Sequence, residues 1–421
     1  MYFWYKFFTY LFYPFAPIYL NFRKLRKKED LNRYKEKLSK INTSREDGFL
    51  IWFHVASVGE AMSILPLIEN CINEQKIDKI LITSITLSSG KVIEKKYKKI
   101  TKVVHQFLPL DIPIFINKFL KHWNPNLSVF IDSEIWPNLI VKIKEKNIPL
   151  LLVNARITKK SFDRWKKIIS FSKKIFGKFD LCIVSNKETE NYLKILGAKN
   201  IKSYGNLKFA NSNSNTNYEL DPSFLTKIKN RKIWCAASTH SSEEVFCAKL
   251  HLELKKNYNN ILTIIIPRHI DRIEAINKEL SNLNLKITFF SKLNELDINT
   301  DILLVDAYGV ATKFYNISKC VFLGKSLVES LKMNSGQNPI EPARLGCKVF
   351  HGPNISNFIE IYKYLNTLGI TKEINSANQL KLSLVEELKE QKIKDNKISI
   401  KIENYGQNIL DNTIKELKKY I

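Results

Sequence analysis

From residue 49 onward, short apolar runs alternate with longer stretches in which apolar residues recur at helical spacing. This alternation is typical of strand–helix–strand units, which build parallel sheets. In the first half, the predicted strands are Phe49–Val55, Lys79–Ile85, Leu127–Ile131, Pro149–Val153 and Asp180–Val184. The helices predicted between them include Met62–Cys71 and Leu139–Lys146. We therefore expect a Rossmann-like domain over residues 29–210.

The pattern restarts after Asn211–Asn217, a polar stretch with the composition of a linker. The strands predicted beyond it are Lys232–Ala237, Ile261–Ile266, Leu285–Phe290, Asp301–Val305, Cys320–Leu323 and Lys348–Phe350. The final amphipathic stretch, Ile398–Ile421, is predicted to be a helix able to pack across both domains, although Gly406 weakens the case for one unbroken helix. Two Rossmann-like halves, the second over residues 211–421, indicate the α/β GT-B glycosyltransferase architecture, with ligands in a central cleft.

The N-terminal segment Tyr2–Phe22 carries one charge, Lys6, and more than half of its residues are aromatic. A basic cluster follows at residues 23–28. About twenty apolar residues can span a bilayer, but Pro14 and Pro17 and the aromatic side chains favour the membrane interface. We expect residues 1–28 to be a membrane anchor that spans or lies flat, rather than a buried core helix. The basic flank predicts that the body stays on the cytoplasmic side.

The composition limits the classes of partner that the protein is expected to bind. The 421 residues carry a formal net charge of +26, which favours an anionic partner, although an AT-rich genome also produces scattered lysines. No arginine-rich block with interleaved aromatics and no zinc-finger spacing is present, so nucleic-acid binding is not expected. The six cysteines lie far apart in the sequence, which indicates a reducing compartment with no disulfides and no structural zinc.

Glu60 follows the predicted strand Phe49–Val55 and the short turn Ala56–Gly59, at the point where a helix should begin. Open α/β sheets place their chemistry at the carboxyl ends of strands, so this carboxylate is a candidate for catalysis. Ser57-x-x-Glu60 also fits a capping box, in which both side chains satisfy free backbone N–H groups. Taken alone, this stretch favours the capping role of Glu60 over the catalytic one.

Three further charged residues of the first half follow predicted strands. Glu134 leaves the strand end after Leu127–Ile131, while Arg156 and Lys208 come after later strands. Glu134 suits either a loop acid or a second carboxylate of the same site as Glu60. The two cations suit either the protein surface or a site that receives phosphate or carboxylate.

The second half offers candidates for binding a phosphorylated ligand. Arg268 and His269 end a predicted strand, where an arginine can fork onto phosphate or form an ordinary salt bridge. In Ser335–Glu341, an amide and an acid precede a helix, which suits ribose or base recognition as well as a plain helix start. No phosphate-binding glycine loop and no Asp-x-Asp after a strand is present, so we expect neither cofactor nor metal. Cations and a helix dipole would then stabilise a leaving phosphate.

Motifs in one order along nearly the whole chain resemble the Kdo transferases, which attach 3-deoxy-octulosonic acid (Kdo) to a lipid A precursor. The motifs are His54–Glu60, Leu108–Asp111, Asp132–Asn138, Asn154–Arg156, Gly205–Lys208, Ala237–His240, Pro267–His269, Gly324–Val328 and Gln337–Glu341. The resemblance implies a metal-independent, inverting transfer from CMP-Kdo to a lipid A precursor at the cytoplasmic face of the anionic inner membrane.

The resemblance also implies roles for single residues. Glu60 would be the general base, and Glu134 and Lys208 would stabilise the transition state. The residues that would hold CMP are Arg268, His269, Gly309, Val310, Ala311, Gln337, Asn338 and Glu341.

The sequence departs from the family pattern at four places, all in the second half: Ser242, Val310, Lys325 and the inserted stretch Ser330–Asn334. These departures motivate two rivals. One is another membrane-associated GT-B glycosyltransferase with a different donor, which competition by CMP rather than UDP would separate. The other is a non-catalytic membrane scaffold, against which nucleotide-dependent thermal stabilisation would count.

Overall fold

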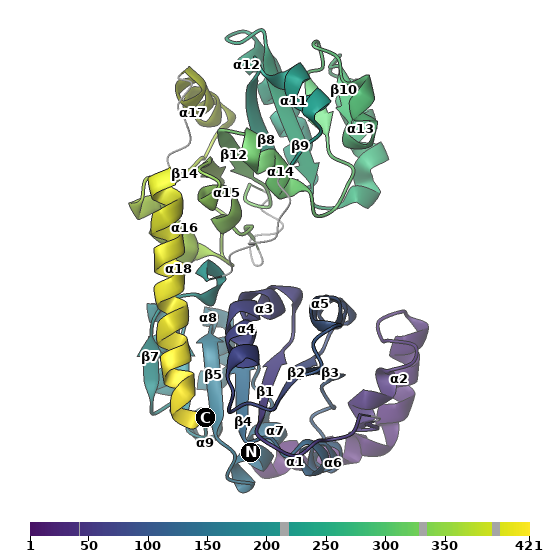
Figure 1. Cartoon of the computed structure of the whole chain (residues 1–421), viewed down its shortest axis with the longest axis vertical. Coiled ribbons are helices and arrows are strands. Elements are labelled where there is room, and N and C mark those ends of the chain that lie inside the picture. Colours follow the sequence, from purple (N-terminus) through teal and green to yellow (C-terminus); the bar gives the residue numbers. More distant parts are fainter. Residues whose placement is uncertain (42, 211–218, 328–334, 390–395) are drawn as a thin grey trace. The chain divides into compact units, whose positions relative to one another are not determined.

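The computed structural model describes residues 1–41, 43–210, 219–327, 335–389 and 396–421. The chain divides into two compact units, residues 1–212 with 404–421 and residues 213–403. Each unit contains one seven-stranded sheet, flanked by helices (Figure 1). The strand pairs in both sheets are parallel.

The first sheet has the strand order β3-β2-β1-β4-β5-β6-β7. Its strands are β1 (Leu50–Val55), β2 (Lys79–Ser84), β3 (Val103–Phe107), β4 (Leu127–Ile131), β5 (Leu150–Ala155), β6 (Leu181–Val184) and β7 (Ile201–Ser203). The chain builds outward from β1 to β3 and then returns to place β4 on the other side of β1. The carboxyl ends of β1 and β4 therefore flank the switch point, where open α/β sheets bind ligands.

Helices cover both faces of this sheet (Figure 1). They are α1 (Tyr2–Phe12), α2 (Ala16–Leu25), α3 (Val58–Ser63), α4 (Leu65–Asn73), α5 (Leu87–Tyr97), α6 (Pro113–Trp123), α7 (Pro137–Glu145), α8 (Lys159–Lys166), α9 (Ile169–Phe176) and α10 (Lys187–Leu196). The short 3₁₀ helices η2 (Tyr34–Leu38) and η3 (Leu207–Phe209) belong to the same unit. The single helix predicted over Met62–Cys71 is in fact α3 and α4, because Pro66 cannot donate the backbone hydrogen bond that would join them.

The second sheet has the order β10-β11-β9-β8-β12-β13-β14. Its strands are β8 (Lys232–Thr239), β9 (Ile261–Pro267), β10 (Ile287–Phe289), β11 (Ile302–Leu304), β12 (Cys320–Leu323), β13 (Lys348–His351) and β14 (Thr371–Glu373). Its helices are α11 (Pro222–Ile228), α12 (Glu243–Lys255), α13 (Ile273–Ser281), α14 (Ala311–Ile317), α15 (Ile340–Arg344), α16 (Ile359–Thr367) and α17 (Ala377–Lys389). The switch point of this sheet lies between β8 and β12.

Each strand predicted from the apolar runs is present. Fully buried strands such as β1 and β4 carry apolar side chains on both faces, which makes them easy to find in a sequence. The three strands that the sequence analysis missed are β3, β7 and β14, which are the partly exposed outer strands of their sheets. Outer strands lack a continuous apolar run because they bury less of their surface.

The C-terminal helix α18 (Asn396–Leu417) is unbroken at Gly406. A Cβ at this position would collide with the carbonyl oxygen of Phe209, so the glycine permits a close approach of helix and loop. The Tyr204 hydroxyl donates to Glu416 at 3.0 Å. Residues from 404 onward thus pack with the first unit, whereas the sequence analysis had placed all of residues 211–421 in the second domain.

The N-terminal helices attach to the first unit through specific polar contacts. The Tyr5 hydroxyl donates to the buried carboxylate of Asp111 at 2.8 Å, and the Asn138 amide donates to Thr9 at 2.9 Å. Burial raises the pKa of Asp111 to about 6. No helix in the described part of the chain has both the length and the apolar character that a membrane span requires.

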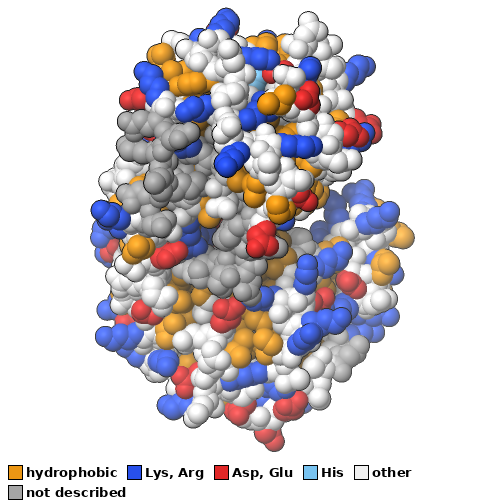
Figure 2. Space-filling model, turned by 45° about the horizontal axis from the view of Figure 1, so that its top comes forward, with side chains coloured by type: hydrophobic (Ala, Val, Ile, Leu, Met, Phe, Trp, Pro, Cys, Tyr) orange, Lys and Arg blue, Asp and Glu red, His pale blue; other side chains and the backbone are white. Residues whose placement is uncertain are grey.

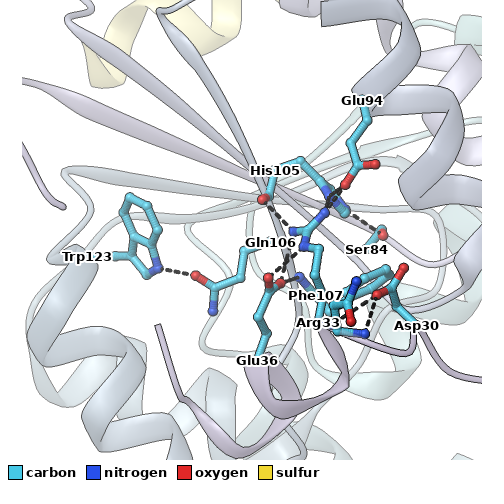
Figure 3. Close-up of polar contacts among 10 residues, drawn as sticks. Asp30, Arg33, Glu36, Ser84, Glu94, His105, Gln106, Phe107 and Trp123 are labelled. Atoms are coloured by element: carbon cyan, nitrogen blue, oxygen red, sulfur yellow. Dashed lines mark hydrogen bonds and ion pairs between the residues drawn. The ribbon is translucent and has the colours of Figure 1, made fainter. Parts of the chain in front are cut away.

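Residues 29–38 attach to the outer strand β3 (Figure 3). The Arg33 guanidinium bonds to Glu36 at 2.6 Å and to the carbonyl oxygen of His105 at 2.9 Å, and it forms an ion pair with Glu94. Burial, with the charge of Arg33, lowers the pKa of His105 to about 3. The neutral ring can then accept from Arg33 at Nδ1 and donate from Nε2 to Ser84.

Candidate active site

The turn after β1 holds Glu60 by three hydrogen bonds. The Ser57 side chain accepts from the Glu60 backbone N–H at 3.3 Å and donates to Glu60 Oε1 at 2.8 Å. The backbone N–H of Ala56 donates to Glu60 Oε2 at 2.7 Å. The serine half of the predicted capping box is therefore formed, whereas the Glu60 carboxylate bonds to the N–H of Ala56 and the hydroxyl of Ser57, and these bonds fix its orientation.

The surroundings of Glu60 favour its protonated form. Burial raises the pKa of Glu60 to about 7, and the negative charges of Asp132 and Glu134 act in the same direction. The hydrogen bonds from Ala56 and Ser57 oppose this shift but do not cancel it. A carboxyl group with a pKa near 7 is matched to accept a proton at neutral pH, so capping and catalysis are compatible here.

Glu134 lies beyond the end of β4 and bonds to two side chains. Its Oε2 accepts from the Trp136 indole at 2.9 Å and lies 3.2 Å from Nε2 of His54, a buried residue of β1. On its other side, His54 Nδ1 lies 2.9 Å from the Thr83 hydroxyl, which accepts from the Trp52 indole at 2.8 Å. Nε2 therefore donates to the Glu134 carboxylate, while Nδ1 faces both the hydroxyl and the carbonyl oxygen of Thr83.

The same contacts keep Glu134 ionised. Burial alone would raise the pKa of Glu134, but the hydrogen bond and charge of His54, together with Trp136, bring it below its ordinary value. The pKa of Glu60 is raised instead, so the two glutamates differ in protonation at neutral pH. Such a division between neighbouring carboxyl groups is typical of acid–base sites.

Asp132 is a third acid of this edge, and the sequence analysis did not include it among the site residues. Its φ of 60° places it in the left-handed region, which is uncommon for a residue other than glycine. Burial raises the pKa of Asp132 to about 6 against the charges of Lys208 and Arg156. A signal was available, because Asp132 is the first residue after β4 in the same motif as Glu134.

The loop that carries Lys208 is tied to β5. The buried Asn154, with φ of 53°, accepts from the backbone N–H of Leu207 at 2.9 Å. Asn206 accepts from the backbone N–H of Lys208 at 3.0 Å. Burial lowers the pKa of Lys208, whereas the charges of Asp132 and Glu60 oppose that change. The predicted residues Glu60, Glu134 and Lys208 thus follow β1, β4 and β7 at one edge of the first sheet.

In the second unit, the predicted donor residues also follow strands at one edge. Arg268 and His269 follow β9, and the His269 ring lies 5.4 Å from the ring of His240, which follows β8. The sequence analysis quoted His240 within a motif but did not name it as a site residue. Glu244, in the first turn of α12, bonds to Arg272 at 3.1 Å.

Glu243 organises this edge. Its carboxylate accepts from four backbone N–H groups, those of His240 at 2.9 Å, Lys325 at 2.7 Å, and Ser326 and Leu327 at 3.1 Å. Glu243 is almost completely buried, and these bonds join the ends of β8 and β12. The sequence analysis gave it no role, because three of its four partners lie more than eighty residues away along the chain.

The remaining predicted donor residues lie in two loops and at the starts of the helices that follow them. Gly309 and Val310 belong to the loop between β11 and α14, and Ala311 is the first residue of α14. The Gln337 carbonyl accepts from Tyr362 at 3.1 Å, and the Asn338 side chain accepts from the backbone N–H of Ile340 at 3.2 Å.

Glu341 lies in the first turn of α15. The stretch Ser330–Asn334 lies outside the described residues. Within the described ranges, no group of three or more histidine, cysteine, aspartate or glutamate side chains is arranged to hold a metal ion.

Comparisons with known proteins agree with this arrangement. Residues 28–211 match the family described as 3-Deoxy-D-manno-octulosonic-acid transferase (kdotransferase). The 3-deoxy-D-manno-octulosonic acid transferase of Rickettsia bellii (strain RML369-C) is 35% identical over 96% of this chain and 94% of that protein. The counterpart from Haemophilus influenzae is 30% identical over 78% of this chain and 76% of that protein.

Solved structures show the fold. A UDP-GlcNAc 2-epimerase from Neisseria meningitidis, solved with UDP-GlcNAc bound, has a TM-score of 0.55 at 11% identity, covering 87% of this chain and 100% of that one. A glycosyltransferase from Rickettsia africae has a TM-score of 0.53 at 14% identity, covering 89% and 99%. The predicted GT-B fold of two parallel α/β domains is confirmed. The chain is a glycosyltransferase that belongs to the 3-deoxy-D-manno-octulosonic acid transferase family.

Proposed function

We propose that this protein transfers Kdo from CMP-Kdo to a hydroxyl group of a lipid A precursor, in an inverting and metal-independent reaction. Membership of the Kdo transferase family supports the transferred sugar. The CMP carrier and the lipid acceptor are parts of the proposal. The observation that carries it is the Glu60 carboxyl group, which is fixed by hydrogen bonds from Ala56 and Ser57 and has a pKa of about 7.

Glu60 is the general base in this mechanism. A single displacement needs a base that removes the proton of the attacking hydroxyl as the new bond forms. The carboxylate is already oriented by Ala56 and Ser57, so little reorganisation is needed before reaction. Glu134 remains ionised beside it, and its charge adds to the burial and the charge of Asp132 that raise the pKa of Glu60 to about 7.

Cations stabilise the charge that develops as the nucleotide leaves. Lys208 and Arg156 supply positive charge at the edge of the first sheet, where Asp132 lies under their influence. Arg268 and His269 supply it at the edge of the second sheet, together with the loops that contain Gly309 to Ala311 and Gln337 to Glu341. Preorganised charges of this kind account for much of the catalysis in many enzymes.

We also propose that the N-terminal segment lies on the cytoplasmic face of the inner membrane. Along α1 and α2, large apolar side chains are exposed, including Phe3 at 69%, Trp4 at 58% and Ile18 at 67%. The basic residues 23–28 follow directly, and such a combination suits the interface of an anionic bilayer. Elsewhere, lysine and arginine side chains are scattered over the face drawn in Figure 2.

The test is a transfer assay with purified protein, CMP-Kdo generated in situ and a tetra-acylated lipid A precursor, read by mass spectrometry. We expect a product heavier by one or more Kdo units. A protein that binds CMP but gives no product would point to another donor sugar or acceptor. A protein that neither binds CMP nor gives product would overturn the proposal and favour the scaffold.

Vesicle flotation tests the location. We expect wild-type protein to float with vesicles that contain anionic phosphatidylglycerol, and a variant with Phe3, Trp4 and Ile18 changed to serine to remain in solution. Equal flotation of both proteins would contradict the proposed role of these side chains.

A further inference from the structure

Lys325 lies beside the turn that ends β8. Leu323 of β12 pairs with Ala237 of β8, and the backbone N–H of Gly324 donates to the carbonyl oxygen of Ala237 at 2.9 Å. A Cβ at Gly324 would lie 2.6 Å from Cα of Thr239, so the glycine lets the two loops touch. Lys325, the next residue, therefore leaves β12 at the switch point of the second sheet.

The main chain of Lys325 is held on both sides. Its N–H donates to Glu243 at 2.7 Å, and its carbonyl oxygen accepts from the N–H of Gly336 at 2.8 Å. Its φ of 58° lies in the left-handed region, which a lysine rarely adopts. Strain of this kind persists only where the surroundings impose it, and it is concentrated at functional sites.

Positive charge accumulates around this lysine without an equal number of acids. Lys325, Arg268 and His269 form no ion pair with any described residue, whereas Arg272 is bound to Glu244. The nearby Glu243 carboxylate is already engaged by four backbone N–H groups. An excess of cations at strand ends is the electrostatic signature of a site for an anion.

His240 adds a donor or acceptor that the protein itself does not use. Its Nε2 is buried and has no hydrogen-bond partner within the described ranges. Burial lowers the pKa of His240 to about 4, and the positive charges of Lys325, Arg268 and Arg272 act on the ring in the same direction. Buried polar atoms in native proteins are nearly always paired, and a bound ligand would supply the missing partner.

We propose that Lys325 and Nε2 of His240 form an oxyanion subsite for the donor nucleotide. This inference rests on the proposed function and deepens it, because the family resemblance assigned no role to Lys325. The oxyanion is either the phosphate or the sugar carboxylate of the donor. A cation beside a buried nitrogen suits both, because charge-assisted hydrogen bonds to oxyanions are strong.

The first experiment measures the binding of CMP and of cytidine to the full-length protein by calorimetry. Glycine fits the left-handed backbone, so Lys325→Gly removes the ammonium group without new strain. We expect its Kd for CMP to rise about tenfold, as for loss of a charge-assisted hydrogen bond, and its Kd for cytidine to stay unchanged. Lys372→Ala, at an exposed position of β14, is the control of equal charge.

The second experiment distinguishes the two oxyanions. If Lys325 contacts the sugar carboxylate, the variant keeps its affinity for CMP, but its KM for CMP-Kdo rises about tenfold. His240→Phe should change the same quantity as Lys325→Gly. Wild-type values for both CMP affinity and donor KM in Lys325→Gly would overturn the subsite.

The results also separate this inference from the proposed function. If the wild-type protein transfers Kdo and the Lys325→Gly variant keeps its CMP affinity and donor KM, the subsite is contradicted and the proposed function is supported. If the wild-type protein binds CMP but does not transfer Kdo, the proposed function is contradicted. Weaker CMP binding by Lys325→Gly would in that case still support the subsite. Absence of CMP binding by the wild-type protein would contradict both.

Discussion

Glu60 and Glu243 occupy equivalent places in the two parallel sheets. Each lies at the start of the helix that follows the first strand of its sheet, and each carboxylate reaches back to the turn. Glu243 is buried and accepts from four backbone N–H groups, which join two loops. Glu60 is partly exposed, bonds to Ala56 and Ser57, and lies near two other acids.

The difference shows how one local motif serves two purposes. A carboxylate that many N–H groups surround is a structural anion, whereas one with few donors and acidic neighbours is available to take a proton. The charges around the switch points of the two sheets also differ. Asp132 and Glu134 lie near Glu60 in the first unit, whereas Lys325, Arg268 and Arg272 carry positive charge near His240 in the second. The first unit is therefore suited to activating a hydroxyl, and the second to holding an anionic donor.

The largest expected effect comes from Glu60→Gln. Glutamine can still accept the hydrogen bond from Ala56, so the cap is preserved while the base is lost. We expect turnover to fall by about 10²-fold or more, with CMP affinity unchanged. Near-normal turnover with a lower melting temperature would return Glu60 to a capping role and remove the contrast with Glu243.

The difference in stability between this variant and the wild-type protein should depend on pH. The pKa of Glu60 is raised on folding, so its favourable contribution is present at low pH and is lost as the pH rises through about 7. The melting temperature of Glu60→Gln relative to wild type should therefore increase between pH 5 and pH 8. A difference independent of pH would contradict the raised pKa.

Glu243→Gln tests the other side of the comparison. An amide oxygen can replace only part of the acceptor capacity of the carboxylate, which leaves buried N–H groups of the loop around Lys325 without partners. We expect a lower melting temperature and about tenfold weaker CMP binding. Glu253→Gln, at a half-exposed ion pair on the same helix, should not weaken CMP binding and should lower the melting temperature less than Glu243→Gln does.

Glu134→Gln has the smallest expected effect on the position of the pH profile. Removing the negative charge of Glu134 removes one of the causes that raise the pKa of Glu60. The acid limb of kcat/KM should move to lower pH by a fraction of a unit, and the rate should also fall. Glu69→Gln, at a surface ion pair, should leave the limb where it is. An unmoved limb in Glu134→Gln would show that the two glutamates are not coupled.

The sequence predicted much of this arrangement, because buried parallel strands are continuous apolar runs and chemistry follows their ends. It located β1, β4 and β12, and with them Glu60 and Glu134. Contacts between residues on different strands could not be predicted from the sequence. The bond from His54 to Glu134 and those from the 325–327 loop to Glu243 depend on strand order, which local patterns do not contain.

At Gly406, a local sequence signal led to a prediction that the folded structure does not follow. A glycine within a helical pattern signals a weak helix when only the local sequence is considered. In the folded protein it allows α18 to approach the backbone of Phe209, and the helix continues. The start of α12 shows the same limit of local patterns, because the side chain of Ser242 makes no capping bond there and Glu243 accepts from the backbone N–H of His240.

The most direct test of the acid–base assignment is the pH dependence of kcat/KM for Kdo transfer by the wild-type protein. Glu60 must be deprotonated to accept a proton, and its pKa is about 7. The rate should therefore rise tenfold per pH unit below about 7 and level off above it, and the residual rate of Glu60→Gln should lack this limb. A wild-type rate that is already at its plateau at pH 5, or a limb that persists in Glu60→Gln, would contradict the account.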